Sequence, residues 1–470
     1  MQEETIAGIA SGMGGGISII RISGENALQV VGSIFRTKKY LSNLQKEEKE
    51  NIIWKSDYFE KKETHTVHYG FIVNDQEEIL DEVIVVLMKG PNSYTKEDVV
   101  EIDTHGGNYV VKKILNELLH HGARLAEPGE FTKRAYLNGR INLLEAESVN
   151  DLIIAKTDAA RTLAINNVDG KLTKQISNLR EKIAKILANI EVNIDYPEYT
   201  DELEVTKDLM HGYLDEINKE LLKLVNGSKN GRIIKNGVNV AIIGKPNVGK
   251  SSILNSLLDE EKAIVTNIPG TTRDIIEGSI TLNGVAINFI DTAGIRKTED
   301  IVEKIGVDKS KKTAENADII LFVLNNNETI SEEEKAMLKK YNNDKLIVFV
   351  NKMDLESKLI IPENIKDIVY GNTIDINGLE KLKERITEKL NLSNIVNKDM
   401  SYLCNLREID LVNKAYESLK NAQSNLDAGF SVDMIEIDLK SAWDYLGEVM
   451  GDSYEGELVD KIFSNFCLGK

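Results

Sequence analysis

The residues with the clearest chemical potential form a glycine-rich turn that ends in a lysine and a serine. Residues 244–251 read Gly-Lys-Pro-Asn-Val-Gly-Lys-Ser, which matches the pattern GxxxxGK[ST]. Glycines at this spacing let backbone N–H groups point at phosphate oxygens. Lys250 supplies a cation for the β and γ phosphates, and Ser251 offers a hydroxyl to Mg²⁺. The turn therefore predicts a nucleoside-triphosphate site.

Two further motifs follow this turn in the order expected of a nucleotide switch. In Gly270-Thr-Thr-Arg-Asp274, Thr272 is expected to sense the γ phosphate and Mg²⁺. In Asp291-Thr-Ala-Gly294, the aspartate would hold a Mg²⁺-bound water, and the glycine lets the backbone approach the γ phosphate. The three motifs together predict a Mg²⁺-dependent switch.

A fourth motif, Asn-Lys-Met-Asp at residues 351–354, indicates which base is bound. Asp354 can accept hydrogen bonds from both N1–H and the exocyclic amine of guanine. Adenine offers neither donor in that arrangement and would leave the carboxylate unpaired, so GTP is predicted. The predicted GTP-binding residues are Asn247, Val248, Gly249, Lys250, Ser251, Ser252, Thr266, Asn267, Ile268, Pro269, Gly270, Thr271, Thr272, Asp291, Thr292, Ala293, Gly294, Asn351, Lys352 and Asp354.

Two residues bear on how hydrolysis would work. Many GTPases place a water-orienting glutamine after Asp-Thr-Ala-Gly, but this chain has Ile295, which cannot hydrogen-bond water. Asn247 could coordinate a monovalent cation beside the phosphates. A K⁺ ion there would place a positive charge where an arginine finger places its guanidinium group. A loop-capping role for Asn247 stays open.

The hydrophobic pattern divides the chain into four segments. Residues 1–139 read as mixed α and β, with an alternating strand at 66–73 and a more buried one at 82–88. Residues 140–236 and 394–470 show helical periodicity, and residues 237–393 alternate short apolar strands with helices. This predicts a multidomain fold: an α+β N-terminal domain, a central α-helical bundle, and an α/β P-loop domain inserted into that bundle. Two separate helical hairpins are the alternative.

Composition limits the class of protein. The chain has 470 residues and a formal net charge of −18, which argues against a sequence-blind nucleic-acid binder. It has two cysteines, Cys404 and Cys467, so no disulfide framework is implied and a cytoplasmic location is expected. No apolar run is long enough to span a bilayer, and we expect no membrane partner.

Several motifs in three separate segments give the sequence a specific resemblance. These are GGGISIIRISG and GPNSYTKEDVVEIDTHGG near the start, GKPNVGKSS and DTAGIR in the middle, and FSNFCLGK at the end. The sequence resembles the MnmE (TrmE) family of tRNA-modification GTPases, whose motifs it carries nearly unchanged. The likeness runs from about residue 5 to the last residue. It implies a homodimer that binds a formyl-tetrahydrofolate-type one-carbon donor through its N-terminal domain, which is also the dimerisation domain.

The resemblance also implies partners and a reaction. With an FAD-dependent partner of the MnmG (GidA) family, such a protein would add an aminomethyl or carboxymethylaminomethyl group to the wobble uridine of certain tRNAs. K⁺ and GTP would bring two nucleotide domains together. A ribosome-assembly GTPase switch and a GTP-regulated folate sensor are the alternatives.

Individual residues can be carried over from the family. Asn247 matches the K⁺ ligand, with backbone groups at Thr266, Ile268 and Thr271 completing the cation site, and Glu303 matches the glutamate that orients water. From the sequence alone, Glu303 reads as a solvated helix residue. The positions that match the folate-type site are Arg21, Glu101, Arg140 and Lys470.

Cys467 matches a cysteine that the family needs for modification. A small buried hydrophobe beside Phe463 and Phe466 is the alternative. The chain departs from the family at residues 372–378, Asn-Thr-Ile-Asp-Ile-Asn-Gly, where other members usually show Ser-Ala. Because that loop lends backbone contacts to guanine, we expect weaker nucleotide affinity, with specificity through Asp354 retained.

Overall fold

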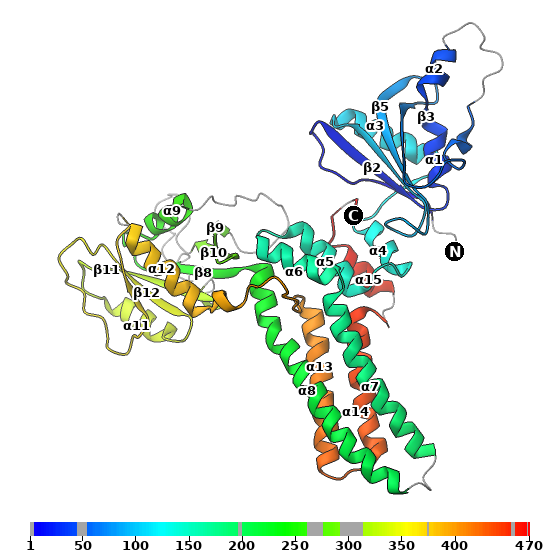
Figure 1. Cartoon of the computed structure of the whole chain (residues 1–470). Coiled ribbons are helices and arrows are strands. Elements are labelled where there is room, and N and C mark those ends of the chain that lie inside the picture. The colour runs from blue at the N-terminus through cyan, green and yellow to red at the C-terminus, as the bar shows by residue number, and fades with distance from the viewer. Residues whose placement is uncertain are drawn as a thin grey trace. The chain divides into compact units, whose positions relative to one another are not determined.

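The computed structural model describes residues 4–44, 54–195, 200–260, 276–291, 314–373, 376–452, 456–467 and 469–470. These residues form two compact units (Figure 1). The first comprises residues 1–150 and 447–470, and the second comprises residues 151–446. No helix among the described residues combines the length and apolarity needed to cross a membrane.

The first unit is built on a seven-stranded sheet with the order β3-β4-β5-β6-β2-β1-β7. All neighbouring strands are antiparallel except β1 and β7, which are parallel. The strands are β1 Ile6–Ile9, β2 Ile17–Ser23, β3 Phe35–Arg36, β4 Thr66–Val73, β5 Ile79–Met88, β6 Val99–His105 and β7 Arg124–Leu125. The alternation seen at 66–73 therefore forms a strand with the predicted bounds.

Helices cover one face of this sheet. Alternate strand residues such as Ile20, Val85 and Ile102 are buried in a core with Val31 of α1 and Ile114 of α3. The helical segments of the unit are α1 Ala27–Ile34, α2 Lys38–Leu44, η2 Ser56–Tyr58, α3 Asn108–His120, α4 Glu130–Leu137, α5 Leu143–Ile154 and α15 Gly456–Phe463; α5 continues into the second unit. This is the α+β arrangement that the sequence predicts.

Helix α15 and the residues after it pack on helix α5. Phe463 and Phe466 share a small core with Leu143 and Ala146, and their rings lie 4.9 Å apart. Helix α5 belongs to residues 140–236 and α15 to residues 394–470, the two segments predicted to share a helical domain, and both lie wholly or largely in the first compact unit.

Long helices form the bundle of the second unit: α7 Lys171–Asp195, α8 Thr200–Asn236, α13 Leu406–Asp427 and the greater part of α14 Val432–Met450 (Figure 1). Helix α8 packs along both α7 and α13. The apolar residues that recur every three or four positions along α7, from Leu172 to Ile190, are buried. Helices on both sides of the nucleotide domain therefore share one core. Leu406, at the start of α13, is exposed, because its position in the first turn points away from that core.

The nucleotide domain contains a six-stranded sheet with the order β13-β12-β11-β8-β10-β9. All pairs are parallel except β9 with β10. Its elements, with the preceding helix α6 and the segment that follows, are α6 Asp158–Val168, β8 Val238–Ile243, α9 Lys250–Glu260, β9 Ile276–Leu282, β10 Val285–Asp291, β11 Ile319–Asn325, α11 Glu332–Tyr341, β12 Leu346–Asn351, β13 Ile368–Tyr370, α12 Ile376–Lys389 and η3 Leu392–Asn394. Because β8, β10, β11 and β12 are parallel, their carboxyl ends meet at one edge, where the predicted motifs lie.

The bundle is joined to this sheet by a tight turn. Gly237, between α8 and β8, has φ +76°, and a Cβ there would stand 2.4 Å from the carbonyl oxygen of Ala286. Asn288 of β10 donates from Nδ2 to the carbonyl oxygen of Asn236 at 3.1 Å. The end of α8 is thus fixed to the two strands that lead to residues 244–251 and to Asp291.

Candidate functional site

The glycine-rich turn has the backbone conformation that a phosphate loop requires. Gly244, Asn247 and Gly249 have φ values of +148°, +64° and +101°. The turn lies between β8 and α9, so its N–H groups and the positive end of α9 converge on one place. The Nζ atom of Lys250 lies inside the loop, 2.7 Å from the carbonyl oxygen of Gly244. An anionic phosphate chain fits this cradle.

The Asn-Lys-Met-Asp motif is bound directly to the phosphate loop. Asn351, at the end of β12, is 1% exposed and donates from Nδ2 to the carbonyl oxygen of Val248 at 2.8 Å. Lys352 donates from Nζ to the carbonyl oxygen of Asn247 at 3.0 Å. The Oδ1 atom of Asn351 is buried and has no hydrogen-bond partner within the described part of the chain. The two motifs therefore form one site, with Asp354 exposed beside it.

Gly249 leaves the space that this contact needs. A Cβ at residue 249 would stand 2.2 Å from Nδ2 of Asn351. Its positive φ also disfavours any side chain. The glycine of GxxxxGK[ST] is thus required both for the loop conformation and for the approach of Asn351.

A further ion pair, which the sequence did not indicate, anchors the loop. Lys245 Nζ lies 2.7 Å from Oε2 of Glu334, whose side chain is 7% exposed. Glu334 also accepts from Ser331 in the capping box of α11. Charge alternation along the chain gives no signal for this pair, because its members are far apart in sequence.

In the N-terminal unit, the predicted folate-type residues gather around an aromatic ring. Arg21 donates from Nε to Oε1 of Glu101 at 2.7 Å, and the two residues are directly paired across β2 and β6. The guanidinium groups of Arg21 and Arg140 lie 5.4 and 4.6 Å from the centroid of Tyr94. Both distances are within cation–π range.

The last residues of the chain reach the same cluster. Arg21 donates from Nη1 to the carbonyl oxygen of Gly469 at 3.3 Å. Gly469 has φ +83°, and a Cβ there would stand 2.1 Å from the carbonyl oxygen of Ile9. Lys470, which follows, is half-buried. Arg21, Glu101 and Arg140 are thus close together, and Gly469, the neighbour of the fourth predicted residue Lys470, lies beside them. Tyr94 was not identified from the sequence as part of this cluster.

Comparison with known proteins identifies the family of this chain. The family description "GTP-binding protein TrmE N-terminus" matches residues 5–140, and "MnmE helical domain" matches residues 143–467. A protein of Streptococcus agalactiae serotype Ia named tRNA modification GTPase MnmE is 45% identical over 470 residues, which cover 99% of this chain and 98% of that one. The chain belongs to the MnmE family. This membership confirms the resemblance found in the sequence and the GTPase class.

Other MnmE relatives also match over the full length of this chain. Those of Enterococcus faecalis and Listeria welshimeri carry the same name and are 45% and 46% identical, covering all of this chain and 99% and 100% of theirs. Among solved structures, the G domain of the T. maritima FeoB iron transporter is 30% identical, covers 32% of this chain and 98% of its own, and has a TM-score of 0.24.

Several predicted MnmE site residues lie outside the described residues. These are Thr266, Asn267, Ile268, Pro269, Gly270, Thr271, Thr272, Thr292, Ala293, Gly294 and Glu303. Asp291 ends β10, paired with Ile242 of β8. Ser251 and Ser252 are exposed in the first turn of α9, next to the loop. Of the residues predicted to bind Mg²⁺ and K⁺, the structure describes only Asn247 and Ser251, which belong to the phosphate loop.

The two thiols of this MnmE chain differ in environment. Cys467 is exposed, whereas Phe463 and Phe466 beside it are buried, so the alternative of Cys467 as a small buried hydrophobe is wrong. The turn after α15 separates it from their core, and its carbonyl oxygen accepts from the N–H of Gly129 at 3.3 Å. The thiol itself is therefore open to solvent.

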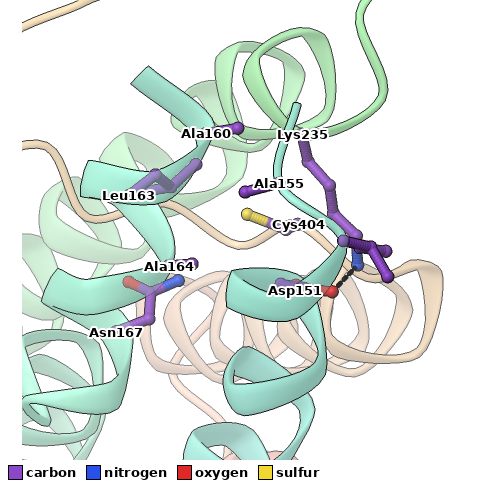
Figure 2. A pocket seen from close by; sticks show the side chains of 9 residues that line it. Asp151, Ala155, Ala160, Leu163, Ala164, Asn167, Lys235 and Cys404 are labelled. Carbon is purple, nitrogen blue, oxygen red and sulfur yellow. Dashed lines mark ion pairs between the residues drawn. The ribbon is translucent and has the colours of Figure 1, made fainter. Parts of the chain in front are cut away.

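Cys404 is buried and lines a small pocket together with residues of α5, α6 and α8 (Figure 2). Lys235 forms an ion pair with Asp151 at 2.6 Å, drawn in Figure 2, and also donates to Asn405. Burial, together with the neighbouring carboxylates Glu408 and Asp151, raises the pKa of the Cys404 thiol well above its usual value. This thiol stays protonated at neutral pH and is shielded from reagents.

We expect iodoacetamide to modify Cys467 and to spare Cys404 in the native protein. The thiolate is the reactive form, so a buried thiol with a raised pKa reacts slowly. Peptide mass spectrometry should find one labelled site in the native wild type, none in Cys467→Ser, and two in the wild type in denaturant. Rapid native labelling of Cys404 would contradict the described burial.

Proposed function

We propose that this chain is a K⁺-activated, Mg²⁺-dependent GTP hydrolase that acts in tRNA wobble-uridine modification. With an FAD-dependent partner of the MnmG (GidA) family, it would help add an aminomethyl or carboxymethylaminomethyl group. The observation that carries the proposal is the contact between Asn351 and the phosphate loop, which joins a guanine motif to a phosphate cradle. The name of the MnmE relatives, tRNA modification GTPase, supports the substrate class.

The described residues fit GTP and Mg²⁺. The positive φ at Gly249 and the buried, unpartnered Oδ1 of Asn351 are features of a loop that accommodates a ligand. Lys250 would neutralise the β and γ phosphates, and Ser251, with Thr272, would hold Mg²⁺. Asp354 would accept from guanine, as derived from the sequence.

The K⁺ site would be completed by backbone groups at Thr266, Ile268 and Thr271. Asn247 is exposed on the loop, where its side-chain oxygen would coordinate the cation, and its carbonyl oxygen accepts from Lys352. A cation there would stabilise charge that develops on the transferring phosphate. Glu303 would orient the attacking water in place of the missing glutamine.

The cluster around Tyr94 fits a folate-type one-carbon donor such as formyl-tetrahydrofolate. Glu101 would accept from the donors of a pterin ring, while Arg21, Arg140 and Lys470 would bind a glutamate tail. Tyr94 offers a flat apolar surface for the ring, already flanked by two guanidinium groups. This site lies beside the segment that carries Cys467, which would contribute its thiol to the modification chemistry.

A homodimer through the N-terminal domain is consistent with the outer face of its sheet. The helices cover one face, whereas Ile17, Val67, Tyr69 and Ile84 are exposed. Tyr69 is directly paired with Ile84, so their side chains share the uncovered face. Burying such an apolar face between two copies would stabilise a dimer. We further propose a cytoplasmic location, where GTP and tRNA are both present.

The proposal predicts that K⁺ accelerates GTP hydrolysis and that Na⁺ does not. An arginine-finger-like charge can be worth about 10³–10⁵ in rate, so we expect at least a tenfold higher turnover in KCl than in NaCl at equal ionic strength. Phosphate release measured in both salts tests this. Asn247→Ala should lose the difference while still binding GDP. Equal wild-type rates in both salts would refute K⁺ activation.

A further inference from the structure

Three side chains that commonly bind metal ions meet between the β4–β5 turn and the C-terminal end of α3. Asp75 lies in the turn, Glu117 on the last turn of α3, and His121 directly after the helix. One ligand atom of each lies within 4.8 Å of the other two. We propose that these residues bind a divalent transition-metal ion, at a site separate from the nucleotide and one-carbon sites.

The His121 ring is fixed so that one nitrogen is free to bind. Its Nδ1 atom lies 2.9 Å from the backbone carbonyl oxygen of Glu117. Because a carbonyl oxygen only accepts hydrogen bonds, Nδ1 carries the hydrogen and donates. In the neutral ring the lone pair is then on Nε2, the atom that faces Asp75. Fixing one ring nitrogen by a backbone carbonyl is how proteins orient the other toward a metal.

The distance between the first two ligand atoms suits one ion. Nε2 of His121 lies 3.3 Å from Oδ1 of Asp75. Two acceptors at this separation repel each other unless the ring is protonated or a cation lies between them. Zinc binds imidazole and carboxylate at about 2.0–2.2 Å, which places two tetrahedral ligands about 3.4 Å apart. Rotation of the half-buried Glu117 side chain would bring in the third ligand.

The elements on both sides hold the ligands in place. In the β4–β5 turn, Oδ1 of Asn74 accepts from the N–H groups of Gln76 and Glu78 at 3.0 and 2.9 Å. The end of α3 contributes the negative pole of its helix dipole, which favours a cation. Asp75 is 52% exposed and His121 is 23% exposed at their side chains, so an ion can enter from solvent. Imidazole with carboxylates suits Zn²⁺ better than Mg²⁺.

Equilibrium dialysis of the full chain against Zn²⁺, followed by metal analysis, tests the site. A Cys467→Ser background removes the exposed thiol as a competing ligand. We expect one Zn²⁺ per chain, with affinity falling at least tenfold in Asp75→Asn, Glu117→Gln and His121→Gln. His120→Ala is the matched control, because it removes the adjacent exposed imidazole outside the triad and should keep the zinc.

A second measurement separates metal binding from loss of structure. Zn²⁺ should raise the melting temperature of the Cys467→Ser protein and leave that of the triad variants unchanged, while circular dichroism remains the same for all. Absence of bound zinc, or equal binding by the triad variants and the His120 control, would overturn the proposal. The proximity of the three residues would then have no role in metal binding.

Discussion

Replacing Gly249 with alanine is expected to lower GTP affinity about 100-fold. Backbone strain and displacement of the phosphate loop would reduce the binding free energy by about 3 kcal/mol. The added Cβ would stand 2.2 Å from Nδ2 of Asn351, on a backbone with φ +101°. Either the loop or Asn351 must move, and either movement separates the phosphate cradle from the base motif. Titration with a fluorescent GTP analogue measures the change.

Gly212→Ala is the matched control for this substitution. Gly212 lies in α8 and has no positive φ, and a Cβ added there would meet no other atom within 4 Å, so alanine should leave GTP affinity unchanged. Circular dichroism of both variants checks that the fold is retained. Wild-type affinity in a folded Gly249→Ala protein would show that the contact between Asn351 and Val248 does not support nucleotide binding.

Exchanging Asp354 for asparagine should change the preferred base from guanine to xanthine. The carboxylate can accept from both donors of guanine, whereas an amide offers one donor and one acceptor, which matches the carbonyl and N1–H of xanthine. Losing a charged hydrogen bond and creating a mismatch costs about 3 kcal/mol, or about 100-fold in GTP affinity. Competition between GTP and xanthosine triphosphate for the wild type and the variant provides the comparison.

The position of Asp354 makes this test specific. Asp354 is exposed. The backbone next to it is held by Asn326, which donates a hydrogen bond to the carbonyl oxygen of Leu355. Asparagine at position 354 should therefore not disturb the fold. Hydrolysis of the preferred triphosphate should be retained. If the variant still prefers GTP as strongly as the wild type does, Asp354 does not read the base.

The sequence predicted best what is encoded locally. The bounds expected for strand 66–73 are those observed, because apolar and polar residues alternate along it. The phosphate loop could be recognised without structure, since its residue types are required by the backbone conformation itself, as the positive φ of Gly249 illustrates.

Contacts between distant parts of the chain could not be predicted. The ion pair of Lys245 with Glu334 joins two elements through side chains that look like ordinary surface charges in the sequence. The same is true of Tyr94, which lies near Arg21 of β2 and Arg140 after α4 because the fold brings these three segments together. Such pairs depend on strand order and register, which hydrophobic patterns do not specify.

The end of the chain shows the same limit. Helical periodicity identified an apolar face on α15 without identifying which residues cover it. The structure places Phe463 against Leu143 and leaves Cys467 exposed. Whether a cysteine beside two phenylalanines is buried depends on where the helix ends, and sequence patterns locate helix ends poorly.

The most direct test of the proposed function is mass spectrometry of tRNA nucleosides from cells that lack this protein. We predict that the wobble-uridine modification is lost, that the wild-type chain restores it, and that Cys467→Ser does not. The variant should retain GTP hydrolysis, because Cys467 lies in the other compact unit from the phosphate loop. Unchanged wobble modification in the deletion strain would contradict a role in tRNA modification.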